Sequence, residues 1–255
     1  MSNMRTSHLA SNLRCVLVAF SFAAPAMAIV ARHDCPDAKL LELGANFPAV
    51  GQVVPDGGCT LIAPNWAVTA AHVAARVPAQ GGKVKFEGAE YPVAAVVLHP
   101  DAKVTPGRPP DIDLALIKLE RPVADIKPVG LYKHADELGK TGVIVGSGDV
   151  GDGRGPPKRS DGRLRAVTNV VDDAGPLRLF CKFDEPPGGT ELEGAGGPGD
   201  SGGPLLIERD GTWLIAGVSS ASMNGKPGRY GVTDVYTRVS IYAEWIEKTM
   251  SAHGQ

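Results

Sequence analysis

Residues 199–204 read Gly-Asp-Ser-Gly-Gly-Pro, a stretch that sets one hydroxyl among three glycines with a carboxylate directly before it. A turn would explain the glycines, because glycine adopts backbone conformations that other residues avoid. A turn would not explain the Asp200–Ser201 pair. Whether Ser201 is a nucleophile depends on which other groups the chain supplies.

Two further segments supply the groups that a serine nucleophile needs. Residues 66–72 (WAVTAAH) end a strand of small residues on His72, and residues 111–117 (DIDLALI) begin an alternating apolar strand after Asp113. A serine hydroxyl needs a base within hydrogen-bond reach, and histidine, with an ordinary pKa of about 6.5, suits that role. A buried aspartate fixes the tautomer of the imidazole. The pattern predicts a hydrolytic site.

The composition favours a β protein. The 255 residues carry a net charge of -2, without the basic surplus of a nucleic-acid-binding protein, and include 32 Gly and 21 Pro. Short apolar segments recur with turn residues between them. Only residues 240–253 show helical spacing, with Ile241, Trp245, Ile246 and Met250 on one face. We expect many short strands and one C-terminal helix.

The N-terminus has the pattern of a secretory signal peptide over residues 1–28. Arg5 and Arg14 precede a short apolar run that ends in Ala26-Met27-Ala28. The run is too short to span a bilayer comfortably. Cleavage after Ala28 would leave Ile29 as the first residue. We therefore expect a secreted or periplasmic protein with no membrane attachment once the signal is removed.

The cysteines set a limit on disulfide bonding. Cys15 leaves with the signal peptide, so Cys35, Cys59 and Cys181 remain. Three cysteines form at most one disulfide within a chain, and the sequence leaves open whether Cys35 pairs with Cys59 or with Cys181. The spacing does not suit a zinc site. We expect neither a metal nor another cofactor.

The order of the three motifs resembles that of the trypsin/chymotrypsin-like serine peptidases. TAAH at 69–72, DLAL at 113–116 and GDSGGP at 199–204 carry the resemblance, and LIAPNW at 61–66 and VYTRVSIYAEWI at 235–246 extend it. It implies an all-β fold of two packed six-stranded antiparallel β-barrels with a C-terminal helix. The expected boundaries are 29–130 for the first barrel, 131–240 for the second and 241–255 for the helix. The site would lie in the cleft between the barrels.

The resemblance assigns roles to the motif residues. His72 would be the general base, Asp113 the orienting acid and Ser201 the nucleophile. The backbone N–H groups of Gly199 and Ser201 would form the oxyanion hole. Asp111 is the weaker candidate for the acid, because only Asp113 directly precedes the Leu-Ala-Leu strand.

The acid before the nucleophile has its own role in this family, where it pairs with the amine of a new N-terminal Ile-Val. Here Asp200 would pair with Ile29, and signal peptidase itself would free the amine. The family usually has Gly-Gly after Ile-Val, whereas Ala31 and Arg32 follow here. The alternative is an N-terminus that lies at the surface.

The sequence allows two predictions for the specificity pocket. Ala195, six residues before Ser201, stands where family members that cleave after Lys or Arg carry an aspartate. Asp234 falls on a second pocket wall, where some members place their acid. It either binds a basic side chain or caps a turn, and in the second case the pocket is neutral and prefers small or apolar residues.

The edge strand of the pocket also departs from the family. Ser219, Ser220 and Ala221 resemble the segment that pairs with the substrate backbone, with Ser220 in the place of the usual tryptophan. That exchange predicts a more open wall. Val73 stands where a cysteine often follows the catalytic histidine, so the usual disulfide there is absent.

These observations predict a secreted serine endopeptidase that acts through an acyl-enzyme intermediate. Its partners would be a polypeptide substrate and, as a second class, a protein inhibitor, and we expect a monomer without nucleic acid. The alternative is a weak or silent homologue that uses the same barrels as a binding surface. Retention of all three motif residues together with Gly199 and Asp200 favours the enzyme.

Overall fold

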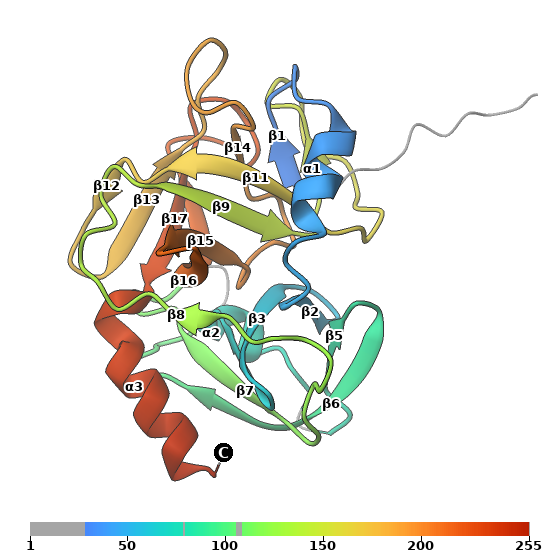
Figure 1. The fold of residues 1–255 in the computed structure, drawn as a ribbon, viewed down its shortest axis with the longest axis vertical. Coiled ribbons are helices and arrows are strands. Elements are labelled where there is room, and N and C mark those ends of the chain that lie inside the picture. Colours follow the sequence, from blue (N-terminus) through green and yellow to red (C-terminus); the bar gives the residue numbers. More distant parts are fainter. Residues whose placement is uncertain (1–28, 79, 106–108, 255) are drawn as a thin grey trace, which may run out of the picture.

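The computed structural model describes residues 29–78, 80–105 and 109–254. The predicted signal peptide and Cys15 lie outside the described residues. Figure 1 shows two β units stacked on each other, with the C-terminal helix along one side. Within the described part, no helix has the length and apolar character needed to span a membrane. The predicted all-β fold class with a terminal helix is confirmed.

The first unit is a closed six-stranded barrel, as predicted. Its strands follow the order β2-β3-β4-β7-β6-β5. Leu61, Trp66, Val68 and Leu116 are fully buried in its core. The strands are β2 (Val50–Val54), β3 (Gly58–Ala63), β4 (Trp66–Thr69), β5 (Lys83–Phe86), β6 (Ala89–Leu98) and β7 (Ala115–Leu119).

The second unit is an eight-stranded sheet that stays open, whereas the sequence predicts a second six-stranded barrel. Its order is β11-β9-β15-β16-β17-β13-β12, and β8 pairs with β16. The edge strand β12 has only two residues and offers too few backbone groups to close the sheet onto β11 at the other edge. The strands are β8 (Gly130–Leu131), β9 (Thr141–Gly146), β11 (Arg165–Val170), β12 (Asp173–Ala174), β13 (Arg178–Lys182), β15 (Pro204–Arg209), β16 (Thr212–Met223) and β17 (Thr233–Arg238).

The segment after the predicted cleavage point lies inside the protein. Strand β1 (Ile29–Ala31) is buried at all three residues. It pairs in parallel with β10 (Val150–Gly151) and antiparallel with β14 (Gly194–Ala195). In the full-length chain this segment therefore does not lie at the surface, in contrast to the alternative.

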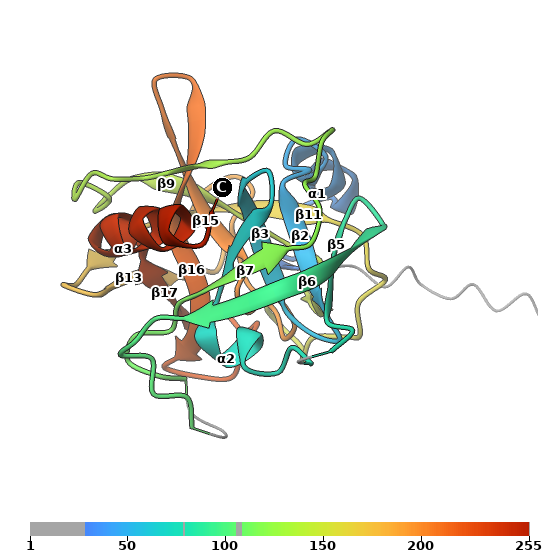
Figure 2. The ribbon, with the colours of Figure 1, turned by 90° about the horizontal axis from the view of Figure 1, so that it is seen from below.

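In the described part of the chain three helices accompany the sheets, and only the last was predicted. Helix α3 (Val239–Ala252) buries Val239, Tyr242 and Ile246, while Ile241 of the predicted apolar face is 45% exposed. Helix α2 (Ala71–Ala74) lies at the edge of the barrel beside β6 and β7 (Figure 2). Helix α1 (Asp37–Gly44) was missed because eight residues carry too little periodicity, and tertiary contacts stabilise such short helices.

Neither of the two pairings that the sequence left open, Cys35 with Cys59 or Cys35 with Cys181, is formed. Cys35, Cys59 and Cys181 are all free thiols. Cys59 belongs to the core of the first barrel and Cys181 to that of the second sheet, so their packing keeps them apart. Cys35 lies near the surface and donates to the Glu191 carbonyl. Burial raises the pKa of the Cys59 thiol to about 12, which makes it chemically inert.

Candidate active site

The barrel brings His72 and Asp113 together through two neighbouring strands. β4 and β7 pair in a register that sets Thr69 opposite Ala115. Asp113 therefore precedes β7 at the same end of the barrel at which β4 leads into α2 and His72. The two motif segments, although some forty residues apart in the chain, meet at one rim.

Asp113 orients the His72 ring. Its side chain is 1% exposed and that of His72 20% exposed. Oδ2 lies 2.7 Å from the ring Nδ1, and Oδ1 accepts from the His72 backbone N–H at 2.9 Å. An ionised carboxylate only accepts hydrogen bonds, so the proton sits on Nδ1 and Nε2 is left as the basic nitrogen. The predicted base and acid are thus in contact.

Ser220 is a third partner of the acid, which the sequence did not predict. Its hydroxyl donates to Oδ2 of Asp113 at 2.6 Å and is buried. An irregularity in β16 between Ser219 and Ala221 turns Ser220 away from the pocket, as a bulge does. The predicted place of Ser220 in the pocket wall is wrong, and Ala221 and Ser222 line that wall instead.

The Ser201 loop packs against the end of β4, just before His72. The Gly58 N–H donates to the Ser201 carbonyl at 2.7 Å, and Thr69 Oγ1 donates to the Gly58 carbonyl at 2.7 Å. A Cβ on Gly202 would lie 2.2 Å from Thr69 Oγ1, so this approach requires glycine. A hydrogen bond from Ser201 to His72 is not among those formed between the described residues, and in resting enzymes this contact is often long.

Gly199 has the backbone that the predicted oxyanion hole requires. Its φ is +93°, in the left-handed region that glycine adopts without strain. A Cβ there would approach the Cα of Gly148 to 3.2 Å. A side chain at Gly199 would therefore disturb both its own backbone and the neighbouring segment.

Asp200 is buried behind this loop. Its carboxylate accepts from the N–H groups of Gly148 at 2.7 Å and Gly197 at 2.8 Å. Burial raises its pKa to about 7. Ile29 pairs with Val150, two residues beyond Gly148, so the predicted partners lie against the same segment. Ala28 precedes Ile29 in the full chain, whose Ile29 nitrogen is an amide, and the ion pair stays a prediction.

A pocket of about 220 Å³ opens beside Ser201 and has Asp234 on its wall. Asp234 lies within β17 and accepts from the Gly196 N–H at 2.7 Å and from the Ser222 hydroxyl at 2.9 Å. Burial raises its pKa to about 6. Ala195 does not line the pocket, because it is buried against Val30 in the β1–β14 pair. Ser219 and Ala221 line it.

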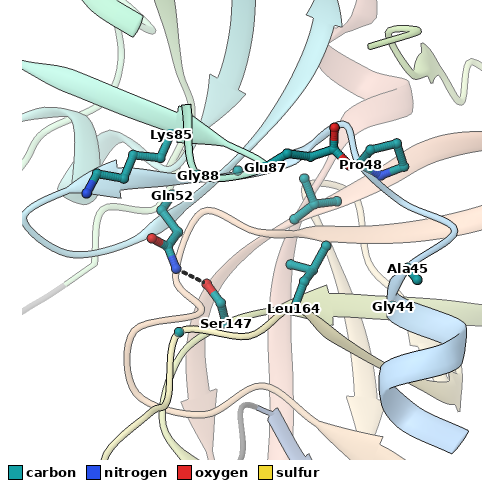
Figure 3. Close-up of a pocket in the computed structure, with 12 residues that line it drawn as sticks. Gly44, Ala45, Pro48, Gln52, Lys85, Glu87, Gly88, Ser147 and Leu164 are labelled. Atoms are coloured by element: carbon teal, nitrogen blue, oxygen red, sulfur yellow. Dashed lines mark hydrogen bonds between the residues drawn. The ribbon is translucent and has the colours of Figure 1, made fainter. Parts of the chain in front are cut away.

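A second hollow, of about 310 Å³, lies between α1 and the first barrel (Figure 3). Gln52 donates to Ser147 across it at 2.6 Å, and none of the three motif side chains reaches it. In the described residues no three His, Cys, Asp or Glu side chains are grouped so that they could hold a metal ion.

Comparison with known proteins decides the family. The Trypsin family model matches residues 45–246, a range that includes His72, Asp113 and Ser201. The chain belongs to the trypsin family. It is 30% identical to a mouse tryptase over 216 residues, which are 74% of this chain and 76% of the relative. A 54-residue stretch is 48% identical to human serine protease 41, covering 21% of this chain and 16% of that protein.

A solved structure agrees with this assignment at the level of the fold. Mouse neuropsin, a serine protease, is similar with a TM-score of 0.66 at 22% identity, over 86% of this chain and 98% of that one. This trypsin-family protein is a serine endopeptidase, a hydrolase. Its family match begins at residue 45 and does not include Ile29.

Gly57 is a further residue that sequence reasoning missed. A Cβ on Gly57 would lie 2.5 Å from Val73 Cγ1. The side chain after His72 therefore faces a glycine, and no disulfide can form between these two positions. The sequence showed that Val73 replaces one cysteine of the usual disulfide, but nothing in it identified Gly57 as the residue opposite Val73.

Proposed function

We propose that this trypsin-family enzyme is secreted and cleaves polypeptides through an acyl-enzyme on Ser201. The Ser201 hydroxyl attacks the scissile carbonyl carbon while His72 Nε2 takes its proton. His72 then gives that proton to the leaving amine as the C–N bond breaks. Water, deprotonated by His72, hydrolyses the ester and restores the serine. The observation that carries this proposal is the buried Asp113, bound to both the ring and the backbone of His72.

The oxyanion of the intermediate would be bound by the N–H groups of Gly199 and Ser201. The left-handed backbone at Gly199 supports this role, because it turns the peptide planes of the loop. Removal of one such donor typically costs roughly 10²- to 10³-fold in kcat. The loop that carries Gly199 and Ser201 must therefore be rigid, and the groups that pack behind it should affect kcat.

Activation would come from an ion pair between the Ile29 amine and Asp200. The carboxylate is buried with two amide donors and a pKa of about 7, and it forms no ion pair with a cation of the described residues. A buried carboxylate is costly without a partner. Removal of residues 1–28 would place a new ammonium at the start of the buried strand β1.

The pocket would accept a basic side chain at the residue before the cleaved bond. Asp234 is its one carboxylate-bearing lining residue, and above about pH 6 it is ionised. Ser219 and Ala221 would pair with the substrate backbone along the edge of β16. Asp234 lies within strand β17 and accepts hydrogen bonds from Gly196 and Ser222. This position argues against a role for Asp234 as a turn cap.

The test is digestion of a mixed-sequence peptide library by the secreted chain, with the products identified by mass spectrometry. We expect cleavage after Lys and Arg, and none from Ser201→Ala prepared in the same way. Cleavage after small or apolar residues would overturn the basic pocket alone. A folded, processed chain that cleaves nothing would overturn the peptidase proposal and favour a binding homologue.

A further inference from the structure

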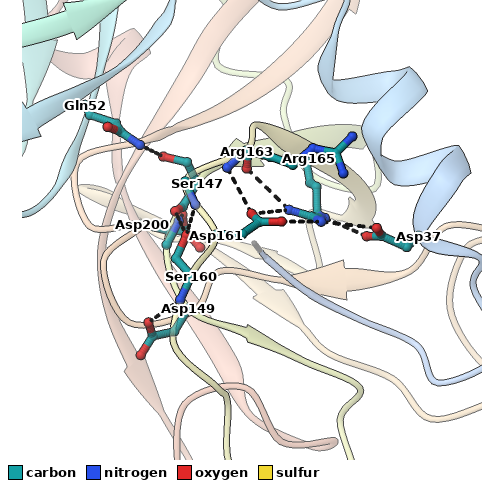
Figure 4. A network of polar contacts seen from close by, with 11 residues as sticks. Asp37, Gln52, Ser147, Asp149, Ser160, Asp161, Arg163, Arg165 and Asp200 are labelled. Carbon is teal, nitrogen blue, oxygen red and sulfur yellow. Dashed lines mark hydrogen bonds and ion pairs between the residues drawn. The ribbon is translucent and has the colours of Figure 1, made fainter. Parts of the chain in front are cut away.

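Arg165 is a fully buried arginine held between two acids (Figure 4). Its Nε and Nη2 donate to Asp37 at 2.5 and 3.1 Å, and its Nη1 and Nη2 donate to Asp161 at 2.9 and 3.1 Å. Two such forked contacts are the strongest arrangement that a guanidinium makes with carboxylates. We call Asp37, Asp161 and Arg165 the Arg165 clamp.

The clamp fastens helix α1 to the start of β11. Asp37 is the first residue of α1, and Arg165 the first residue of β11. At the other end of the helix, a Cβ on Gly44 would lie 2.8 Å from the Arg165 Cα. Both ends of α1 therefore rest on the same residue, and the segment that follows β1 cannot shift without breaking the clamp.

Asp161 extends the clamp into the loop at residues 147–162. Its neighbour Ser160 donates through Oγ to the Ser147 carbonyl at 2.5 Å, and through its backbone N–H to Asp149 at 3.2 Å. Gln52 of the first barrel holds Ser147 from the other side. Ser147 and Asp149, which flank Gly148, are thus both held by Ser160, the residue next to Asp161.

Gly148 and Asp149 in turn support the loop before Ser201. The Gly148 N–H donates to Asp200 at 2.7 Å, and the Asp149 N–H donates to the Pro198 carbonyl at 2.6 Å. A Cβ on Gly148 would lie 2.6 Å from that same carbonyl. The segment therefore lies directly behind the residues that lead into the proposed oxyanion hole.

We propose that the Arg165 clamp is a positioning device that holds the oxyanion loop in its catalytic conformation once the N-terminal segment has docked. This inference rests on the proposed function of Gly199, Asp200 and Ser201. The N-terminal segment contacts the loop at residues 147–162 directly, through the pairing of β1 with Val150–Gly151. It is also linked to that loop through Arg165, which donates to both Asp37 and Asp161. In the described part of the chain no disulfide shares this task.

The test compares Asp37→Asn and Arg165→Met with wild type in the secreted chain. Asp37→Asn weakens one side of the clamp and Arg165→Met removes its centre, and both substitutions nearly keep side-chain volume. We expect kcat for a peptide amide to fall roughly tenfold, less than the 10²- to 10³-fold of losing an oxyanion donor outright. The affinity for a peptide aldehyde, whose adduct with Ser201 places an oxyanion in the hole, should fall by the same factor. KM should stay within about twofold, because the ground-state contacts are unchanged.

A matched control separates positioning from general stability. Asp136→Asn breaks another acid–arginine contact of the second unit, in which Asp136 accepts from Tyr132 at 2.6 Å and from Arg209 at 3.2 Å. We expect it to lower Tm and to leave kcat and aldehyde affinity unchanged. Arg165→Lys, which keeps the charge, should recover part of the kcat lost in Arg165→Met.

The outcomes distinguish the clamp from the peptidase itself. If Asp37→Asn and Arg165→Met lower only Tm, as the control does, the clamp is merely structural and the proposal is overturned. If Arg165→Met does not fold, Asp37→Asn decides alone. If wild type neither cleaves peptides nor binds the aldehyde, the proposed function fails, and amide hydrogen exchange at Gly148 and Asp149 still tests the clamp. Faster exchange in Asp37→Asn supports it, and unchanged exchange overturns it.

Discussion

The two β units hold their parts of the site by different physical means. The first barrel positions His72 and Asp113 with a closed ladder and an apolar core, and Asp113 is its one buried acid in the described residues. The second unit, which carries Ser201 and the pocket, contains a set of buried charged groups. In the described residues these are Arg165, Asp200, Asp234, Glu137, Glu193 and Arg238, and the carboxylates of Asp200, Asp234 and Glu193 accept backbone N–H bonds.

This difference indicates which part of the enzyme responds to pH and to charge. An apolar core resists small changes of condition, because its packing does not titrate. Buried carboxylates respond to pH and to the arrival of a cation, because burial penalises their charged form. We therefore expect substitutions near Ser201 to change activity through charge, and substitutions in the first barrel to change stability through packing.

Asp113→Asn should have the largest effect of those considered. The variant keeps the shape of the site but no longer fixes the proton on Nδ1 of His72, so kcat should fall roughly 10⁴-fold. Steady-state kinetics on a peptide amide measure this directly. A loss smaller than tenfold would show that the acid of the first barrel does not orient the base.

Asp200→Asn should follow, with a loss of about 10²- to 10³-fold in kcat, comparable with losing an oxyanion donor. The neutral amide of this variant cannot form an ion pair with the Ile29 ammonium. The loop that contains Gly199 would then lose the charge that stabilises it. The control is Asp136→Asn, which leaves this loop untouched. Equal activity of Asp200→Asn and wild type would contradict the activation pair.

The same residue predicts a pH effect on folding stability. Burial raises the pKa of Asp200 from 3.8 to about 7 in the chain without a free Ile29 amine. The folded state then binds more protons than the unfolded state between these values, so the free energy of unfolding falls as pH rises from about 4 to 7. We expect this fall in a chain that begins at Ala28 and a smaller one in a chain that begins at Ile29. Denaturant titrations across pH measure it, and identical profiles would argue against the ion pair.

Asp234→Asn should change selectivity more than overall rate. We expect kcat/KM for Lys and Arg substrates to fall roughly 10- to 100-fold, since truncating one partner of a buried charge pair is costly. Substrates with Ala or Leu at that position should change little. In wild type, activity on basic substrates should rise with pH through about 6 as Asp234 ionises. An unchanged substrate preference would remove Asp234 from the specificity pocket.

Leu116→Ala in the first barrel should have the smallest effect on activity. Leu116 is fully buried, so the substitution should lower the free energy of unfolding by about 2–5 kcal/mol. The kcat of the folded fraction should stay near that of wild type. Denaturant unfolding and active-site titration measure the two quantities separately. A large loss of kcat at full folding would show that the barrel also tunes the chemistry.

The sequence identified the family because each of its motifs consists of neighbouring residues whose types are chemically constrained. The segments that carry His72, Asp113 and Ser201 can each be recognised from a few consecutive residues. The sequence could not predict that Ser220 turns to Asp113 and Ser222 to the pocket, because a one-residue irregularity in β16 changes which side chain faces inward.

Polar contacts between residues far apart in the chain were the second feature that the sequence could not predict. Helix α1 owes its position to the contact of Asp37 with Arg165, 128 residues away, and no local pattern indicates such a pair. The disulfide expectation was wrong for a similar reason, because pairing depends on which core each cysteine enters.

The most direct test of the central claim is to treat the secreted protein with a fluorophosphonate and analyse it by intact and peptide-mapped mass spectrometry. The account predicts one label, on Ser201, in a chain that begins at Ile29, and no label in His72→Ala. A folded chain that begins at Ile29 and takes no label would contradict the claim that Ser201 is an activated nucleophile. A label on a chain with a different N-terminus would retain the nucleophile and contradict activation through Ile29.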